Sequence, residues 1–254
     1  MVNGEWSKPR APRVMPGYFT LSVARNIITA LHLVVTTAAM AGENEWRQLQ
    51  DQAQEAFDRR DFARAERLVR EALLEADASL GAYHRATEDS LDLLSLTLRV
   101  EKRPEEALPF AQRLVSVRTR RYGARDVHTA VALHNNAEIL IALGRLDAAE
   151  ESQEAAVEIF TVKLGPDHFN TAAGLHNLGA IRLKQKRYAE AESYLRRSLA
   201  AKEQASKPGN LSIASTLDNL AVALQAQGKQ AEARQIKGRA DAMRRAAARG
   251  QAPR

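Results

Sequence analysis

Histidines are the residues of this 254-residue sequence that come nearest to a chemical site, because it contains no cysteine. His134 and His176 lie 42 residues apart, and Glu138 follows His134 by one helical turn. Zinc accepts imidazole and carboxylate ligands, but a catalytic zinc ion needs three protein ligands and Glu138 is the only obvious third one. We therefore expect no metal site and place these histidines in a groove or on the surface. His168, which follows Gly165-Pro-Asp, is expected to bond the backbone of its loop.

The usual signatures of enzymes are missing from the sequence. It has no His-Glu-x-x-His motif, no Gly-x-Ser-x-Gly motif and no glycine-rich phosphate loop. The lack of cysteine removes disulfides, cysteine–zinc sites and thiol catalysis. Carboxylate pairs such as Glu150–Glu151 are expected on solvated helix faces, where burial does not shift their pKa. These observations predict a protein that is not an enzyme and uses no cofactor.

An internal repeat of 42 residues sets the spacing of these side chains. Asparagine recurs at this interval, at Asn135, Asn177 and Asn219. We call a set of residues with this spacing a column. A column of small residues runs through five units without a gap, as Ala65, Ala107, Ala149, Ala191 and Ala233. Self-similarity at a fixed period is the signature of a repeat architecture in which each unit packs on its neighbours.

Each unit is expected to contain two helices. In the third unit the first helix is predicted from about Thr129 to Ala142, Gly144 ends it, and Leu164-Gly-Pro-Asp-His closes the unit. The chain is rich in good helix formers, whereas aromatic residues make up only 5% of it. A β-sandwich or barrel would need more aromatic and β-branched residues. The sequence therefore predicts an all-α protein.

The helix–turn–helix unit, with a small residue in its first helix and Tyr188-x-x-Ala191 opening the second, resembles the tetratricopeptide repeat. The 42-residue form, with Leu-Gly-Pro-Asp-His and Leu-His-Asn-Leu-Gly between Leu164 and Gly179, resembles the kinesin-light-chain type of repeat. The match is strong from Val127 onward and weaker over 43–84 and 85–126. This resemblance implies a right-handed helical-hairpin solenoid of about five repeats over residues 43–248.

The resemblance also implies that the first helices line a concave groove that binds an extended or helical peptide from a partner protein. The chain would then be an interaction scaffold or adaptor. Asparagine suits such a groove, because its amide both donates and accepts hydrogen bonds. The alternative is that the asparagines only bond neighbouring helices and fix the repeat geometry. The expected groove residues include His134, Asn135, Glu138, His176, Asn177, Lys184, Asp218 and Asn219.

Residues 1–41 differ from the repeats and are expected to form an N-terminal export segment, a signal peptide or an anchor. Basic residues precede an apolar run from Phe19, and Ala39-Met40-Ala41 resembles a cleavage site. An ordinary apolar helix docked on the first repeat is the alternative. A working signal would place the protein in the bacterial periplasm or outside the cell, and without one a cytoplasmic location is expected.

The charge alternates along the repeats. The net charge is +6 overall, and the units 43–84, 85–126, 127–168, 169–210 and 211–254 carry −4, +2, −5, +5 and +5. This alternation indicates either a polarity signal for a bipolar peptide or attraction between neighbouring units.

The second helix of the last unit, from Lys229 to about Ala248, is basic and is expected to cap the solenoid. A disordered tail over 249–254 is expected to follow it. An alternative function is a basic accessory protein that contacts nucleic acid or anionic lipid through this helix. Outside the N-terminal segment, however, positive and negative charges nearly balance, so we expect a protein or peptide partner and no nucleic acid. Membrane contact is expected only through an N-terminal anchor.

Overall fold

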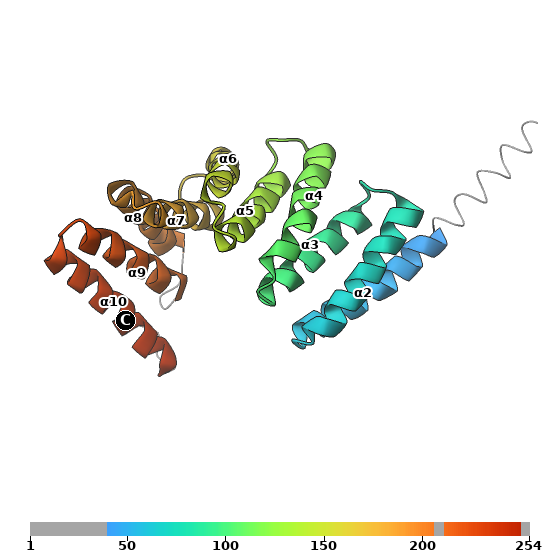
Figure 1. The fold of residues 1–254 in the computed structure, drawn as a ribbon, viewed down its shortest axis with the longest axis horizontal. Coiled ribbons are helices and arrows are strands. Elements are labelled where there is room, and N and C mark those ends of the chain that lie inside the picture. The colour runs from blue at the N-terminus through green and yellow to red at the C-terminus, as the bar shows by residue number, and fades with distance from the viewer. Residues whose placement is uncertain (1–39, 206–210, 250–254) are drawn as a thin grey trace, which may run out of the picture.

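The computed structural model describes residues 40–205 and 211–249 and contains, in this part of the chain, helices and no strand. The helices form five consecutive hairpins arranged in series (Figure 1). They are a helix over residues 40–58, α2 (Phe62–Glu75) continued by the π-helical segment η1 (Ala76–Leu80), α3 (Arg85–Val100), α4 (Pro104–Tyr122), α5 (Val127–Ala142), α6 (Leu146–Leu164), α7 (Phe169–Lys184), α8 (Tyr188–Ala205), α9 (Leu211–Ala226) and α10 (Gln230–Ala248). The predicted helical-hairpin solenoid is confirmed.

The turn inside each hairpin has one residue in the left-handed backbone region, and these residues are again 42 apart. Glycine occupies the position in two hairpins, and the others hold residues for which this conformation costs about 1 kcal/mol. The repeated turn therefore follows the period even where the residue type does not favour it. The residues are Arg60 (φ 62°), Lys102 (φ 60°), Gly144 (φ 71°), Lys186 (φ 61°) and Gly228 (φ 81°).

The connections between hairpins are built from a second periodic set of bonds. A polar side chain caps α3, α5 and α7 by accepting a backbone N–H two residues further on. His168 does this for α7, accepting from Asn170 N at 3.1 Å through Nδ1, which confirms the expectation for this residue. The three caps are His84, Asp126 and His168.

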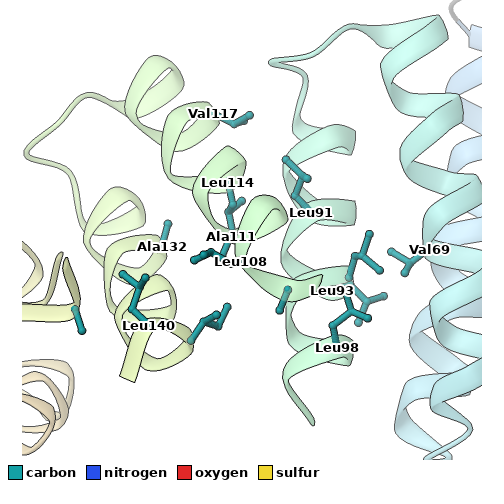
Figure 2. Packing of buried hydrophobic residues seen from close by; sticks show 14 of the residues in the cluster. Val69, Leu91, Leu93, Leu98, Leu108, Ala111, Leu114, Val117, Ala132 and Leu140 are labelled. Atoms are coloured by element: carbon teal, nitrogen blue, oxygen red, sulfur yellow. The ribbon is translucent and has the colours of Figure 1, made fainter. Parts of the chain in front are cut away.

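The core runs along the solenoid as clusters of buried side chains, because each helix from α2 onward packs on the next and α7 also touches the first helices α5 and α9. The alanine column of the second helices is buried throughout, with Ala233 the most exposed at 6%. Figure 2 shows the core between the first three hairpins, where Leu91 and Leu98 of α3 lie between Val69 of α2 and Leu114 of α4. Small residues in the alanine column let the helix backbones approach closely.

The outward face of the last hairpin is polar. Lys237 and Asp241 of α10 occupy the positions at which α8 carries Leu195 and Leu199, which α9 helps to bury. A further hairpin would have to bury these charges, which is costly without partners.

Most of the expected export segment lies outside the described residues, because these begin at Met40, the first residue of the helix over 40–58. Residues 250–254 of the expected C-terminal tail also lie outside them. None of the helices that the structure describes is long and apolar enough to span a bilayer.

Candidate functional site

A groove of about 620 Å³ runs across the first helices of the first three hairpins. Its walls contain both polar and apolar side chains, which come from the helix over 40–58, from α3 and from α5. We call this feature the N-terminal groove. It is lined by Trp46, Gln50, Asp51, Gln54, Asp89, Asp92, Leu93, Leu96, Arg99 and Asn135.

Hydrogen bonds between the helix over 40–58 and α3 hold Trp46 in the wall of the N-terminal groove. The indole Nε1 donates to Ser90 Oγ at 2.9 Å, and Ser90 Oγ donates to Gln50 Oε1 at 2.9 Å. Gln50 Nε2 then donates to the backbone oxygen of Asp89 at 3.4 Å. Since the polar edge of the indole is already satisfied, its ring is the part left for a ligand.

Three carboxylates of the N-terminal groove differ in how well their charge is compensated. Asp92 accepts from Arg118 Nη2 at 2.8 Å, and that arginine side chain is only 9% exposed. Asp89 has Arg85 Nε at 3.5 Å, but the Arg85 side chain is 76% exposed, so the pairing is weak. Burial raises the pKa of Asp89 above its usual value. Asp51 is exposed and makes no ion pair with the described residues.

The only basic residue of the N-terminal groove wall is neutralised by α5. Arg99 Nη1 bonds the Glu138 carboxylate, whose other oxygen lies 3.6 Å from His134 Nε2. His134 is mostly buried, with its ring 6.4 Å from that of Phe160, and burial lowers its pKa below the usual value. Of the expected residues on α5, Asn135 therefore lines the open groove, and Glu138 holds α3 and α5 together.

The expected residues on α7 mostly bond other helices. His176 Nδ1 lies 3.1 Å from Thr216 Oγ1 of α9, and burial and the nearby Lys202 lower the pKa of His176 to about 4. Asn177 Nδ2 donates to Gln153 Oε1 of α6 at 3.3 Å. Lys184, at the end of α7, is exposed.

The expected residues on α9 are the last two. Asp218 accepts from Lys237 Nζ at 2.9 Å and also pairs with Arg244, both on α10, so its charge serves the last hairpin. Asn219 is half-buried. The structure thus places the expected residues along one series of first helices, with Asn135 in the groove and several others tied to neighbouring helices.

A buried line of polar side chains joins the last three hairpins. Lys202 is 4% exposed, and its Nζ donates to Thr216 Oγ1 at 2.9 Å and to the backbone oxygen of Ser212 at 3.2 Å. Burial lowers the pKa of Lys202 to about 8. Gln153 is fully buried at the other end. We call this set the polar seam, and its members are Gln153, His176, Asn177, Lys202 and Thr216.

Sequence reasoning missed the acidic and aromatic part of the N-terminal groove. A signal was present, because Gln50 and Asp92 stand in the column of His134 and His176, two and one repeats before His134. It also missed Gln153 and Lys202, which sit in columns of buried residues. No three histidine, aspartate or glutamate residues in the described ranges are grouped as a metal would require.

Ion pairs link neighbouring hairpins on the outer helices. Arg103 Nη1 lies 2.7 Å from Glu66, and Arg196 Nη2 lies 2.6 Å from Glu232. Glu192 of α8 is partly buried, which would raise its pKa, but hydrogen bonds from Lys229, Gln227 and Arg196 lower the pKa to about 2. The pair of Arg103 with Glu66 joins units of opposite net charge, as one interpretation of the charge pattern requires, whereas Glu192 and Glu232 make their pairs between two units that are both positive.

Comparison with known proteins identifies the repeats. A tetratricopeptide repeat model matches residues 128–204 and 172–246. No curated protein matches the chain. These matched residues contain the three units in which the sequence pattern is strongest.

Solved structures share the fold over most of the chain. One contains a variant of the nearly identical TPR-like repeats of a Podosopora anserina protein described as a kinesin light chain, at 20% identity and TM-score 0.68 over 80% of this chain and 96% of that chain. BtubC (BKLC) from P. vanneervenii is 21% identical with TM-score 0.67, over 87% of this chain and 94% of that chain. The apo form of RapI is 18% identical with TM-score 0.68, over 78% of this chain and 70% of that chain. At these identities the likeness concerns the fold: residues 128–246 match the tetratricopeptide repeat, and the chain shares the helical-hairpin solenoid of a protein described as a kinesin light chain.

Proposed function

We propose that the protein is a non-enzymatic scaffold that holds a segment of a partner protein in the N-terminal groove. The observation that carries this proposal is the groove itself, an open volume of about 620 Å³ lined by the first helices of three successive hairpins. This volume lies within the range of about 300–1,000 Å³ that is common for ligand pockets. Its lining combines apolar, amide and charged groups, which suits a polypeptide more than a single small polar molecule.

The chemistry of the groove wall supports a peptide ligand. Gln54 and Asn135 line it with amide groups, which can donate to carbonyls and accept from N–H groups of a bound backbone. Leu96 is half-buried and offers apolar surface beside them. Among the fold neighbours, a Rap protein has been solved in complex with competence and sporulation factor.

We propose that the bound segment continues along the other expected groove residues. It would pass from Asn135 over the first helices α7 and α9. Lys184, at the end of α7, would contact the segment with its exposed side chain. The half-buried residues along this path would contact it with the part of each side chain that remains exposed, and they are His134, Glu138, His176, Asn177, Asp218 and Asn219.

The competing interpretation, binding of nucleic acid or anionic lipid through α10, has less support. Lys237 and Arg244 are held by Asp218, and Arg239 is held by Glu203. Pairing within the chain reduces the positive field that such a surface needs.

The test is partner capture from an extract of the native host with the full chain as bait. In Leu96→Trp a bulky uncharged side chain occupies the groove, so we expect partners captured by the wild type to be lost. Val100→Trp is the matched control, because Val100 lies one turn further along α3, is 43% exposed and does not line the groove. Equal capture by both variants would show that the partner does not bind in the N-terminal groove.

A further inference from the structure

The N-terminal groove carries information about the chemistry of its ligand, and this inference rests on the proposed function. We infer that the groove selects a partner segment that places an arginine or lysine against Asp51 and Asp89, with its aliphatic stem and an adjacent apolar residue on Trp46 and Leu96. The partner chemistry is therefore a cationic, partly apolar peptide.

The charge balance of the groove wall is the first argument. Asp51 makes no ion pair with the described residues, and Asp89 pairs only with Arg85, at 3.5 Å and on an exposed side chain. Asp92 is compensated from below by Arg118. The groove surface therefore carries excess negative charge, and a cation on the ligand would compensate this charge.

No positive group of the wall is left to attract an anionic ligand. Arg99 is the only basic residue that lines the groove, and its guanidinium is bonded to Glu138 of α5. An acidic peptide would have to break this bond or lie against uncompensated carboxylates, and like charges placed together cost several kcal/mol. The wall thus selects by repulsion as well as by attraction.

The burial of one carboxylate adds to this demand. The pKa of Asp89 lies above its usual value mainly because burial disfavours the ionised form, and the neighbouring Glu88 and Asp92 also raise it. A bound cation would reverse both effects, since an opposite charge nearby favours the ionised carboxylate. Part of the binding free energy would come from pairing a carboxylate whose charge is only weakly compensated in the free protein.

The aromatic and apolar part of the wall favours a long cationic side chain over a small cation. Trp46 is held by its bond to Ser90, so its ring is presented without the cost of ordering it. Indole is the best aromatic partner for an ammonium or guanidinium group. The methylene stems of arginine and lysine also cover apolar surface such as that of Leu96.

The test uses a random 12-residue peptide library displayed on phage, selected on the immobilised full chain. We expect the enriched peptides to carry an excess of arginine or lysine beside apolar residues. Synthetic copies should bind the double variant Asp51→Asn, Asp89→Asn about tenfold more weakly than the wild type, since each lost charge contact is worth a few-fold. Asparagine keeps the side-chain size, and thermal unfolding of the double variant checks that the fold is unchanged.

The controls separate this inference from the proposed function. Glu45→Gln removes one negative charge from the helix that carries Asp51, at an exposed position that does not line the groove, and it should leave binding unchanged. Enriched peptides that are neutral or acidic, or that bind the double variant as tightly as the wild type, would overturn the inference. If they still lose binding in Leu96→Trp, the proposed function stands without it. Peptides insensitive to Leu96→Trp, or no enrichment, would overturn both.

Discussion

The N-terminal groove and the polar seam share two columns of the repeat but use them differently. Asp51 and Asn135 of the groove wall are aligned with Asn177 of the seam, yet only Asn177 is bonded to a helix of the preceding hairpin. In the groove such positions remain open, whereas in the seam they join hairpins. A position on a repeat is therefore most open to a ligand where the neighbouring helices offer it no partner.

The difference has a physical origin in the spacing of the helices. At Gly174 of α7 a Cβ atom would lie 2.9 Å from Gln153 Nε2, so the missing side chain makes room for that glutamine. At Gly179 a Cβ atom would lie 2.6 Å from Leu195 Cγ. Both glycines let α7 approach its neighbours closely, and polar side chains at the contact then find each other. The corresponding position of Gly179 is Ala53 in the first helix and Ser95 in α3.

The largest expected difference between the two regions is in acid, which should lower the free energy of unfolding through the polar seam. The pKa of His176 falls from 6.5 to about 4 on folding, because burial and Lys202 disfavour its charged form. The unfolded chain therefore binds the proton first, and the stability contributed above pH 6.5 is lost as the pH falls toward 4. Linkage gives about 3 kcal/mol between pH 7 and pH 4. Urea unfolding at several pH values measures it.

The matched variant for this prediction is His176→Gln, which keeps a polar group but cannot titrate. Its stability should depend less on pH in this window by roughly the same amount. An unchanged pH dependence in His176→Gln would show that the polar seam is not the acid-sensitive part of the molecule.

The close approach of α7 can be tested by adding one carbon. Gly179→Ala should lower the free energy of unfolding by about 2 kcal/mol, because overpacking a filled core against Leu195 costs about 1–3 kcal/mol. Ser95→Ala, at a buried position in the same column of the second hairpin, should change it by less than about 1 kcal/mol, since it adds no atom to the core. Denaturant unfolding of both variants gives the comparison, and equal effects would contradict it.

The two asparagines separate binding from stability. Asn177→Ala leaves the fully buried Gln153 without a hydrogen bond donor and should cost about 1–2 kcal/mol of stability. Asn135→Ala should change stability by less than about 0.5 kcal/mol but weaken binding of groove-selected peptides. Titration calorimetry and thermal unfolding read the two effects. Binding lost only in Asn177→Ala would reverse the assignment of the two regions.

The smallest expected effects lie in the left-handed turns. Gly144→Ala should cost about 1 kcal/mol, because a side chain is strained at φ 71° even though nothing lies within 4 Å of its Cβ. Lys186→Gly should stabilise the protein by about 0.5 kcal/mol, since relief of strain exceeds the added freedom of the unfolded chain. Melting temperatures that move in the same direction for both variants would show that turn strain does not control the stability of the third and fourth hairpins.

The sequence alone determined the architecture, because its signals are local. The 42-residue period predicted every hairpin, and the structure places left-handed residues at that same interval from Arg60 to Gly228. The first helix predicted from about Thr129 to Ala142 is α5, Val127–Ala142, and the basic helix expected to reach about Ala248 ends there. Helix propensity, glycine turns and small-residue columns act within one or two turns of chain, so one sequence suffices to detect them.

Only the tertiary structure decided which side chains of a column are free. Asn135 and Asn177 both follow Leu-His in aligned units, but one lines a groove and the other meets Gln153 across a helix interface. The bond from Trp46 to Ser90 spans 44 residues, and that of Lys202 to Thr216 joins two hairpins. Such contacts depend on how closely helices approach, which is set by packing on both sides at once and leaves no periodic mark in the sequence.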